Sequence, residues 1–262
     1  MNVADYLTGI TFNQIQPDAA ITPDQLAGSV RPPHISNSVI WDLINTNLPE
    51  NEKVMKERLG SILEMPRMST FGIAAIINHA VSQLSSEEAF VNVGVWHGFT
   101  LLAGMINNQD KICIGIDNFS EFSGHLDSGK EANLCPPVPI SFYKRFNHHR
   151  SPQHGFHEMD YEEYFEKVHQ GPIGLYMYDG EHSYKNQLRG LQVAEKFFAP
   201  HCLVLVDDTN KNETRQATLD FIERSSLDYE IMFDKKTSCG GHPTFWNGIM
   251  IFRRTGDAKT KS

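Results

Sequence analysis

The chain has 262 residues, 40% of them hydrophobic and 21% charged, and a formal net charge of −9. This is an ordinary globular composition, and its acidic balance offers no basic surface for nucleic acid or an anionic membrane. No apolar run is long enough to span a bilayer, and the opening MNVADYLTGITFNQ has no signal-peptide pattern. The four cysteines are scattered without CxxC spacing, which is typical of reduced thiols. We therefore predict a cytoplasmic protein without a nucleic-acid or membrane partner.

Residues 1–65 are interrupted by prolines and show little periodicity, apart from two helical stretches at Val39–Asn45 and Glu52–Leu63. We interpret this region as an N-terminal arm or cap. It either covers one face of a sheet, closes over a substrate, or joins two copies of the chain in a homo-oligomer. Residues 66–262 are predicted to form the main domain, which opens with a helix capped near Ser69–Thr70.

The first strong pattern in the main domain is AFVNVGVWHGFT, followed by a second strand and an acid. The predicted order is strand, glycine turn, helix, strand and acid, at Phe90–Val93, Gly94 to Gly98, Phe99–Ile106, Ile112–Ile116 and Asp117. Glycine lets a backbone approach a ligand closely, and an acid at the end of the next strand suits the two hydroxyls of a ribose.

The full dinucleotide pattern G-x-G-x-x-G is absent, because bulky Val95, Trp96 and His97 separate the two glycines. A pyrophosphate needs close backbone approach at the middle glycine, so NAD fits poorly. A nucleoside without phosphates tolerates this change, which favours S-adenosylmethionine.

Residues 118–155 form a long connection that we interpret as a lid or insertion, with a short helix at Phe142–His149. Four histidines lie in or just after this connection: His148, His149, His154 and His157. They are either metal ligands or, more simply, solvated side chains. A short strand at Gly155–Met159 is predicted next. It ends in Asp160 and leads into the helix Tyr161–Val168.

Two further apolar runs, Ile173–Tyr178 and Cys202–Val206, are separated by an amphipathic helix predicted at Tyr184–Phe198. Such a crossover makes the two strands parallel, so their carboxyl ends meet at one edge of the sheet. The residues that follow these strands are carboxylates, with a histidine close by: Asp179, His182, Asp207 and Asp208. We expect a ligand site at this edge.

After the helix Glu213–Arg224, two apolar stretches at Tyr229–Phe233 and Phe245–Phe252 are joined by a Gly/Pro-containing loop. This pattern predicts an antiparallel hairpin. The predicted fold is therefore α/β and Rossmann-like, with a seven-stranded, mostly parallel sheet that ends in a C-terminal antiparallel hairpin.

Residues 68–253 resemble the class I S-adenosylmethionine-dependent methyltransferases, and more narrowly the metal-dependent O-methyltransferases related to macrocin and mycinamicin O-methyltransferase. The resemblance rests on VNVGVWHGFT, IGIDNF, YDGEHSYKNQLRGL, VLVDD and WNGIMIFRR. It implies methyl transfer to a hydroxyl of a sugar or another natural product. One position departs from the family, which often carries an acid two residues before the first glycine, where this chain has Asn92.

The resemblance also implies roles for individual residues. It assigns a divalent cation, Mg²⁺ by its preference for hard oxygen ligands, to Asp179, Asp207 and Asp208. It assigns the general base to His182, whose ordinary pKa near 6.5 suits proton transfer at neutral pH. The predicted donor-binding set is Asn92, Gly94, Gly98, Thr100, Asp117, Asn118, Asp160 and Asp179.

Several alternatives stay open from the sequence. Asp208 could instead cap the following helix, and His182 could instead hydrogen-bond the backbone at a helix start. The chain could bind a nucleoside without turnover. His125 and Asp127 with His182 or His201 mimic the facial triad of an Fe(II) oxygenase. This alternative is less favoured, because oxygenases with that motif are usually all-β, whereas this chain alternates strands and helices.

Overall fold

A computed structural model describes residues 1–20, 39–120 and 138–258 of the chain. His125 and Asp127 of the alternative iron triad lie outside these residues, as do residues 121–137 of the predicted lid. The N-terminal region contributes short elements in this order: α1 (Val3–Gly9), β1 (Thr11–Phe12), α3 (Val39–Asn45), β2 (Thr46–Asn47) and α4 (Glu52–Leu63). The helices α3 and α4 have the predicted bounds, whereas α1 and the β1–β2 pair were not predicted.

The main domain alternates helices and strands. Its first half consists of α5 (Phe71–Ser82), β3 (Ala89–Val93), α6 (Phe99–Met105), β4 (Ile112–Asp117), α7 (Val138–His149), β5 (His154–Glu158) and α8 (Tyr161–Lys167). Its second half consists of β6 (Ile173–Tyr178), α9 (Tyr184–Glu195), β7 (Phe198–Asp207), α10 (Asn212–Arg224), β8 (Leu227–Lys235) and β9 (Ile249–Ala258).

Seven of these strands form one sheet in the order β5-β4-β3-β6-β7-β9-β8. The strands from β5 to β7 pair in parallel, whereas β9 runs antiparallel between β7 and β8. This arrangement confirms the predicted Rossmann-like fold with its antiparallel C-terminal pair. The last strand, β9, lies between β7 and β8, so β8 forms the edge of the sheet.

The register of the parallel strands explains where ligand-binding residues gather. Val93 pairs with Ile116 on one side and with Tyr178 on the other, and Tyr178 pairs with Val206. The residues that leave these strands therefore emerge next to one another. This brings the glycine turn and the predicted acids to a single carboxyl edge, as parallel pairing requires.

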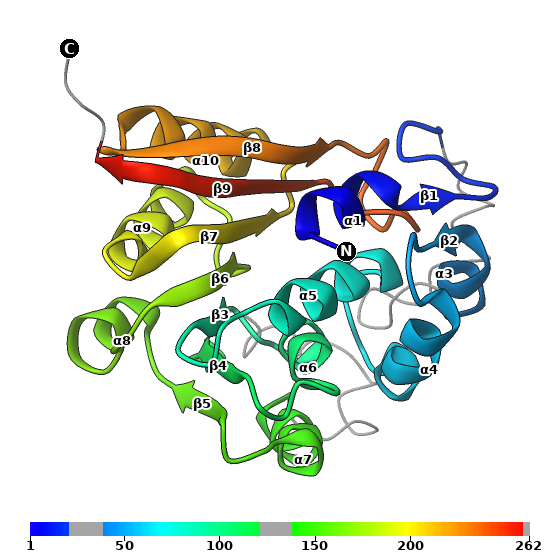
Figure 1. The fold of residues 1–262 in the computed structure, drawn as a ribbon, viewed down its shortest axis with the longest axis horizontal. Helices are drawn as coiled ribbons and strands as arrows, with labels where there is room; N and C mark the ends of the chain where they lie inside the picture. The colour runs from blue at the N-terminus through cyan, green and yellow to red at the C-terminus, as the bar shows by residue number, and fades with distance from the viewer. Residues whose placement is uncertain (21–38, 121–137, 259–262) are drawn as a thin grey trace.

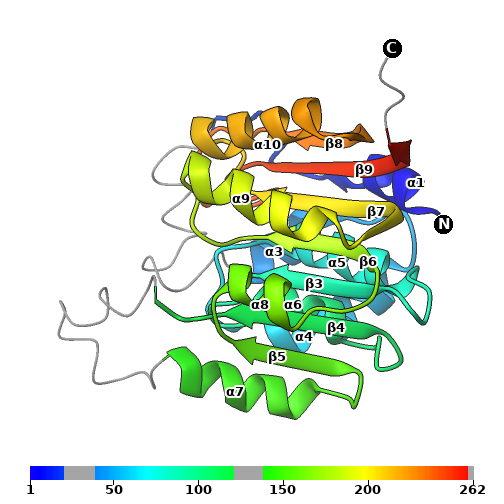
Figure 2. The ribbon, with the colours of Figure 1, turned by 90° about the vertical axis from the view of Figure 1, so that its left-hand side faces the viewer.

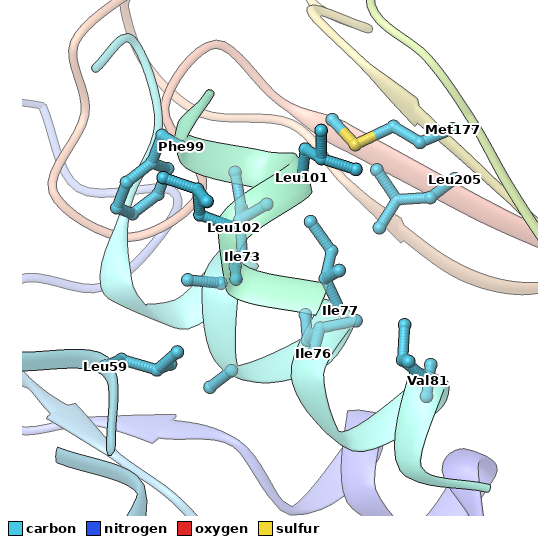
Figure 3. Close-up of a cluster of buried hydrophobic side chains, with 14 of the residues drawn as sticks. Leu59, Ile73, Ile76, Ile77, Val81, Phe99, Leu101, Leu102, Met177 and Leu205 are labelled. Carbon is cyan, nitrogen blue, oxygen red and sulfur yellow. The ribbon is translucent and has the colours of Figure 1, made fainter. Parts of the chain in front are cut away.

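Helices cover both faces of the sheet. Figures 1 and 2 show α8, α9 and α10 on one face, and α5 and α6 with the N-terminal elements on the other. Figure 3 shows how Ile73 and Ile77 of α5 meet Leu101 of α6 and the sheet residues Met177 and Leu205. All five side chains are at most 1% exposed. Burial on this scale supplies the main driving force for folding.

The N-terminal region packs into this same core. Tyr6 of α1 is 1% exposed and stacks on the His79 ring of α5, with the ring centroids 3.9 Å apart. Leu59 of α4 is fully buried in the α5–α6 cluster (Figure 3). The described part of residues 1–65 therefore covers one face of the sheet. Whether it is a separate unit or also forms a contact between copies stays a prediction.

Several predicted boundaries differ from those in the structure, and two of them have a clear structural cause. The helix expected to reach Phe198 ends at Glu195, because Phe198 already pairs with Ile173 in the sheet. The strand expected from Phe245 begins at Ile249, because an isolated bridge between His242 and Trp246 and a positive φ at Gly248 bend the chain first. None of the helices in the described part of the chain has the length and apolar composition needed to cross a bilayer.

Candidate active site

A cavity of about 920 Å³ opens at the carboxyl edge of the sheet. Ligand sites of small molecules have volumes of this order. One wall, here called the glycine-turn wall, consists of Gly94, Val95, Trp96 and Asp117. A second set of lining residues, here called the assembled wall, consists of Arg67, Lys211 and Trp246. The acids that follow β6 and β7 lie on the cavity surface together with both walls, so this cavity brings the predicted site together.

Gly94 lies at the closest contact between the glycine turn and the strand beside it. Its φ is +80°, and a Cβ atom there would lie 1.9 Å from the backbone oxygen of Asp179. The Asp179 N–H in turn donates to the Val93 oxygen at 2.8 Å. No side chain fits at this crossing, so the sequence requires glycine here for backbone geometry as well as for ligand access.

Asp117 organises the turn from the end of β4. Its Oδ2 accepts the N–H groups of Val95 and Trp96, both at 2.7 Å, and its Oδ1 accepts the N–H of Phe119 at 2.7 Å. Each carboxylate oxygen has two acceptor positions, so Oδ2 is fully used and Oδ1 has one position left for a donor such as a ribose hydroxyl. The carboxylate therefore has a structural role that the sequence prediction did not include.

Three other residues predicted to bind the methyl donor lie at or next to the glycine turn. Asn92 is fully buried; it donates to the Gly94 oxygen at 3.2 Å and accepts the Thr100 hydroxyl at 2.7 Å. Gly98 has a φ of +99° and starts α6. Thr100 is on the cavity surface, whereas Asn92 and Gly98 are not among the lining residues. Asn92 thus braces the turn rather than facing the cavity.

Asn118 and Asp160 line the cavity near its mouth and are both exposed. The Asn118 side chain accepts the N–H and hydroxyl of Ser120, at 3.1 and 2.7 Å. The Asp160 side chain caps α8 by accepting the Glu162 N–H at 2.8 Å. Both stay predictions as donor contacts, and the helix cap alone accounts for an acid at position 160.

His182 lies between two of the predicted acids. Its Nε2 is 3.6 Å from Asp179 Oδ1 and 3.4 Å from Asp208 Oδ2. The ring is not used to cap α9, because the Ser183 hydroxyl accepts the Asn186 N–H. His182 Nδ1 is buried and has no hydrogen-bond partner among the described residues. The ring therefore presents Nε2 to the acids, and the alternative of a backbone-bonded histidine is not supported.

Burial shifts the pKa values of two groups in the acid cluster, Asp207 and His182. Burial raises the pKa of Asp207 well above its usual range, and the neighbouring Asp208 carboxylate raises it further. Burial lowers the pKa of His182; Asp208 opposes this change, and Lys211 adds to it. A lowered pKa keeps His182 neutral near pH 7, the state in which Nε2 accepts a proton.

The three aspartates have the donor atoms that a hard cation prefers, but their arrangement does not fit one. Among the described residues, no group of three or more His, Cys, Asp or Glu side chains could hold a metal ion. Asp207 is 2% exposed, and its Oδ1 accepts the backbone N–H of Asp208 at 2.8 Å. Asp208 Oδ2 already contacts the Lys211 ammonium at 2.5 Å. The predicted ligands therefore share an edge of the cavity without forming a coordination shell.

Asp208 does not cap the following helix through its side chain. It adopts a φ of +57°, a left-handed conformation that aspartate tolerates better than most residues. Its backbone oxygen accepts the Lys211 N–H at 2.9 Å, and α10 has no side-chain cap. This turn carries Lys211 back over the Asp208 carboxylate.

The assembled wall was not predicted. Arg67 is fully buried, forms an ion pair with Asp42 of α3, and donates to the Ser69 oxygen at 2.9 Å. Trp246 has a φ of +49° and is held by paired backbone hydrogen bonds to His242, each 3.0 Å long. The only sequence signal was the position of Lys211, three residues after an acid pair and one before a helix. Tyr184, at the start of α9, donates to Asp220 at 2.6 Å and is not among the lining residues.

The histidine alternatives are not brought to the site. His154 contacts the Asn108 oxygen at 3.2 Å, and the His157 ring packs on Tyr164 with the centroids 4.8 Å apart. His148 and His149 lie in the last turn of α7. His201 lies near the amino end of β7, away from the carboxyl edge. These positions do not support a histidine metal site in the described residues.

Comparison with known proteins identifies the class. Residues 91–209 match a family model described as a methyltransferase domain. No curated protein matched the chain in a sequence search. The chain is similar in fold to the cofactor-bound Rv0187 from MTB, with 10% identity over 78% of this chain and 89% of that chain and a TM-score of 0.53. It is also similar to the O-methyltransferase from Bacillus cereus in complex with SAH, with 12% identity over 78% and 90% and a TM-score of 0.50.

The matched region runs from β3 to the turn after β7 and includes the glycine turn, Asp117 and the acid cluster. Residues 91–209 therefore match a methyltransferase domain, and the chain has the fold of the class I methyltransferases.

Proposed function

We propose that the protein transfers a methyl group from S-adenosylmethionine to a hydroxyl of a small molecule. The observation that carries this proposal is one continuous cavity that joins the glycine-turn wall to His182 and its flanking acids. A nucleoside bound at the glycine turn would point its sulfonium toward Asp179. The acceptor would then occupy the space beside His182 and the assembled wall, and the acceptor class is a hydroxylated natural product or sugar.

Proton removal is the task that falls to the chain's own residues. An alcohol becomes a competent nucleophile only as its proton is lost. In the proposed step His182 Nε2 accepts the hydroxyl proton, and the acceptor oxygen attacks the methyl carbon. The carbon–sulfur bond breaks, and its electron pair stays on sulfur as a neutral thioether. Asp179 and Asp208 flank Nε2 and would stabilise the imidazolium that forms.

Positioning supplies the rest of the rate enhancement. Displacement at a sulfonium is in line, so the donor and acceptor must be held at near-attack distance. The buried Asn92–Thr100 pair and the Asp117 hydrogen bonds would fix the donor loop, while the assembled wall would hold the acceptor.

The divalent cation expected from the family resemblance is the part of the function that this geometry supports least. Mg²⁺ would supply charge to the acceptor oxygen if Asp179, Asp207 and Asp208 turned toward one another. Because the arrangement does not fit a cation, the proposed step does not use one. Titration with Mn²⁺ decides whether the cation belongs to this enzyme.

Replacing His182 tests the proposed base. The His182→Ala enzyme should lose about 100-fold in turnover, within the range for a general base, and should keep its affinity for S-adenosylhomocysteine. His148→Ala is the matched control, since that histidine is exposed at the end of α7. Acceptors are found by mass spectrometry, as a mass gain of one methyl group in a panel of sugars and phenols. Full activity of His182→Ala would remove the base assignment.

A protein that only binds the donor is the second candidate from the sequence, and the departure at Asn92 was its support. Asn92 lies beneath the turn with its hydrogen bonds satisfied by the turn itself. Its presence in place of an acid therefore does not disable the cavity surface. Binding of S-adenosylhomocysteine with no methyl transfer to any member of a wide panel would favour this second candidate.

A further inference from the structure

Lys211 holds the position at which a cation would meet the acid cluster. Its Nζ lies 2.5 Å from Asp208 Oδ2, and His182 Nε2 faces the same oxygen from 3.4 Å. The Lys211 side chain is 46% exposed, whereas that of Asp208 is 14% exposed. The ammonium therefore reaches inward from the rim of the cavity onto a largely buried carboxylate.

The cavity surface offers little other positive charge. Among its described lining residues, Arg67 and Lys211 are the two that carry a permanent charge of this sign. Arg67 is fully buried against Asp42 and lies in the N-terminal part of the wall. Three aspartates, in contrast, lie along the edge beside His182. Lys211 is the cation placed among them.

A divalent cation and Lys211 would compete for one carboxylate. Two positive charges at contact distance from a single oxygen repel each other. Lysine carries its charge on a flexible stem with three donors, so one ammonium can contact Asp208 and an acceptor oxygen together. Its charge is smaller than that of Mg²⁺, but it is attached to the chain and needs no coordination shell.

We propose that the Lys211 ammonium takes the place of a divalent cation, donating a hydrogen bond to the acceptor oxygen as that oxygen loses its proton to His182. This inference rests on the proposed function of the same site. The proton still moves from the acceptor to His182 Nε2, and the methyl still leaves sulfur with the carbon–sulfur electron pair remaining on sulfur. Lys211 keeps its own protons throughout, and methyl transfer proceeds without added metal.

Mn²⁺ alone is the first probe, because its binding can be followed by electron paramagnetic resonance without any acceptor. The proteins compared are the wild type, Lys211→Met and the control Lys185→Met, whose lysine is exposed and absent from the cavity lining. We expect no Mn²⁺ binding to the wild type or the control. Lys211→Met should bind Mn²⁺, because the freed carboxylates can then turn toward a metal. Thermal unfolding of each variant checks that it folds.

Turnover with an acceptor from the mass-spectrometric screen is the second readout. Wild-type activity should be unchanged by EDTA or by added Mg²⁺. Lys211→Met should lose about 100-fold, as for removal of one donor to a developing oxyanion, and should recover part of this on addition of Mg²⁺ or Mn²⁺. Lys211→Arg should keep more activity than Lys211→Met because it retains the charge.

The outcomes separate the two proposals. Binding of Mn²⁺ by the wild type, with loss of turnover in EDTA, would overturn the role of Lys211 and leave the methyltransferase function intact. Failure of both the wild type and Lys211→Met to bind Mn²⁺ would also overturn it, since no cation position would then exist. Loss of all methyl transfer in the wild type, with donor binding retained, would instead contradict the proposed function.

Discussion

The two walls of the cavity are built in different ways. The glycine-turn wall comes from one continuous β3–α6–β4 unit, and backbone groups make most of its contacts, including the three N–H groups that Asp117 accepts. The assembled wall comes from opposite ends of the chain. There the Thr70 hydroxyl donates to the Thr244 oxygen at 2.7 Å, which joins the start of α5 to the loop that carries Trp246.

This difference suggests that the two walls have different roles. The first can be shared by many enzymes of one class, and the second can differ from one enzyme to the next. A wall made of backbone geometry depends little on the identity of its side chains, and the fold itself is shared with structures that are only 10–12% identical to this chain. A wall made of side chains from distant segments can change its residues without disturbing the sheet. We therefore expect donor binding to depend on the first wall and acceptor choice on the second.

The largest expected effect is at the crossing between Gly94 and Asp179. In Gly94→Ala the new Cβ would meet the Asp179 backbone oxygen at 1.9 Å, in a left-handed conformation that alanine adopts at a cost. We expect the free energy of unfolding to fall by more than about 3 kcal/mol. Urea denaturation followed by circular dichroism measures it.

Gly60→Ala is the matched control, since nothing lies within 4 Å of a Cβ built there in the middle of α4. Alanine should raise stability at that helical position by about 0.5–1 kcal/mol. Equal effects of the two substitutions would mean that the backbone crossing does not define the glycine-turn wall.

Acid should destabilise the protein through His97, which follows Trp96 in the glycine turn. Burial, with a smaller contribution from Arg145, lowers the pKa of His97 to about 4, from 6.5 in the unfolded chain. The unfolded chain thus binds the proton first. The stability that His97 contributes is fully present above pH 6.5 and is lost as the pH falls toward 4, by about 3 kcal/mol in all.

His97→Gln tests this pH dependence. Unfolding free energies of the wild type and the variant are measured by urea denaturation from pH 7.5 to 4.5. The wild type should lose more stability than the variant over this interval. Parallel curves would show that the imidazole under the glycine turn is not held neutral by burial.

Asp117→Ala should weaken S-adenosylhomocysteine binding by about 100-fold, or about 2–3 kcal/mol. The substitution removes the carboxylate proposed to bind the ribose and leaves three backbone N–H groups of the turn without their acceptor. Calorimetry measures the affinity. Asp160→Ala is an informative comparison because it removes a helix cap at the cavity mouth. A similar loss of affinity in Asp160→Ala would indicate that the ribose is bound at the start of α8 and not at the end of β4.

The smallest expected effect on donor binding is at Trp246. Trp246→Ala should change the S-adenosylhomocysteine affinity by less than about twofold, because this residue belongs to the assembled wall. It should change the acceptor profile in the mass-spectrometric screen. A large loss of donor affinity would erase the distinction between the two walls.

Sequence patterns predicted the glycine-turn wall well because its residues lie close together in the sequence. Alternating strand and helix periods fixed the parallel sheet, and parallel pairing placed Gly94, Asp117, Asp179 and Asp207 at one edge. The same patterns predicted β6 with its observed bounds, Ile173–Tyr178. They did not reveal that Asp117 also ties down the turn, because hydrogen bonds to a loop leave no periodic signal.

The assembled wall could not be predicted because its contacts are far apart in sequence. The ion pair between Arg67 and Asp42 and the bond between Thr70 and Thr244 depend on tertiary packing alone. Lys211 had a local signal, its spacing from Asp208, but a lysine at a helix start is usually solvated. The metal prediction assumed that three acids at one edge all face one point. Burial of Asp207 and the Asp208–Lys211 pair keep them apart.

Titration of the wild-type protein with S-adenosylhomocysteine in a calorimeter tests the central claim most directly. If the glycine turn and Asp117 form the donor site, the wild type will bind one molecule per chain, and Asp117→Ala will bind about 100-fold more weakly. Absence of any binding heat from the folded wild type at several temperatures, or equal affinity in both proteins, would contradict it.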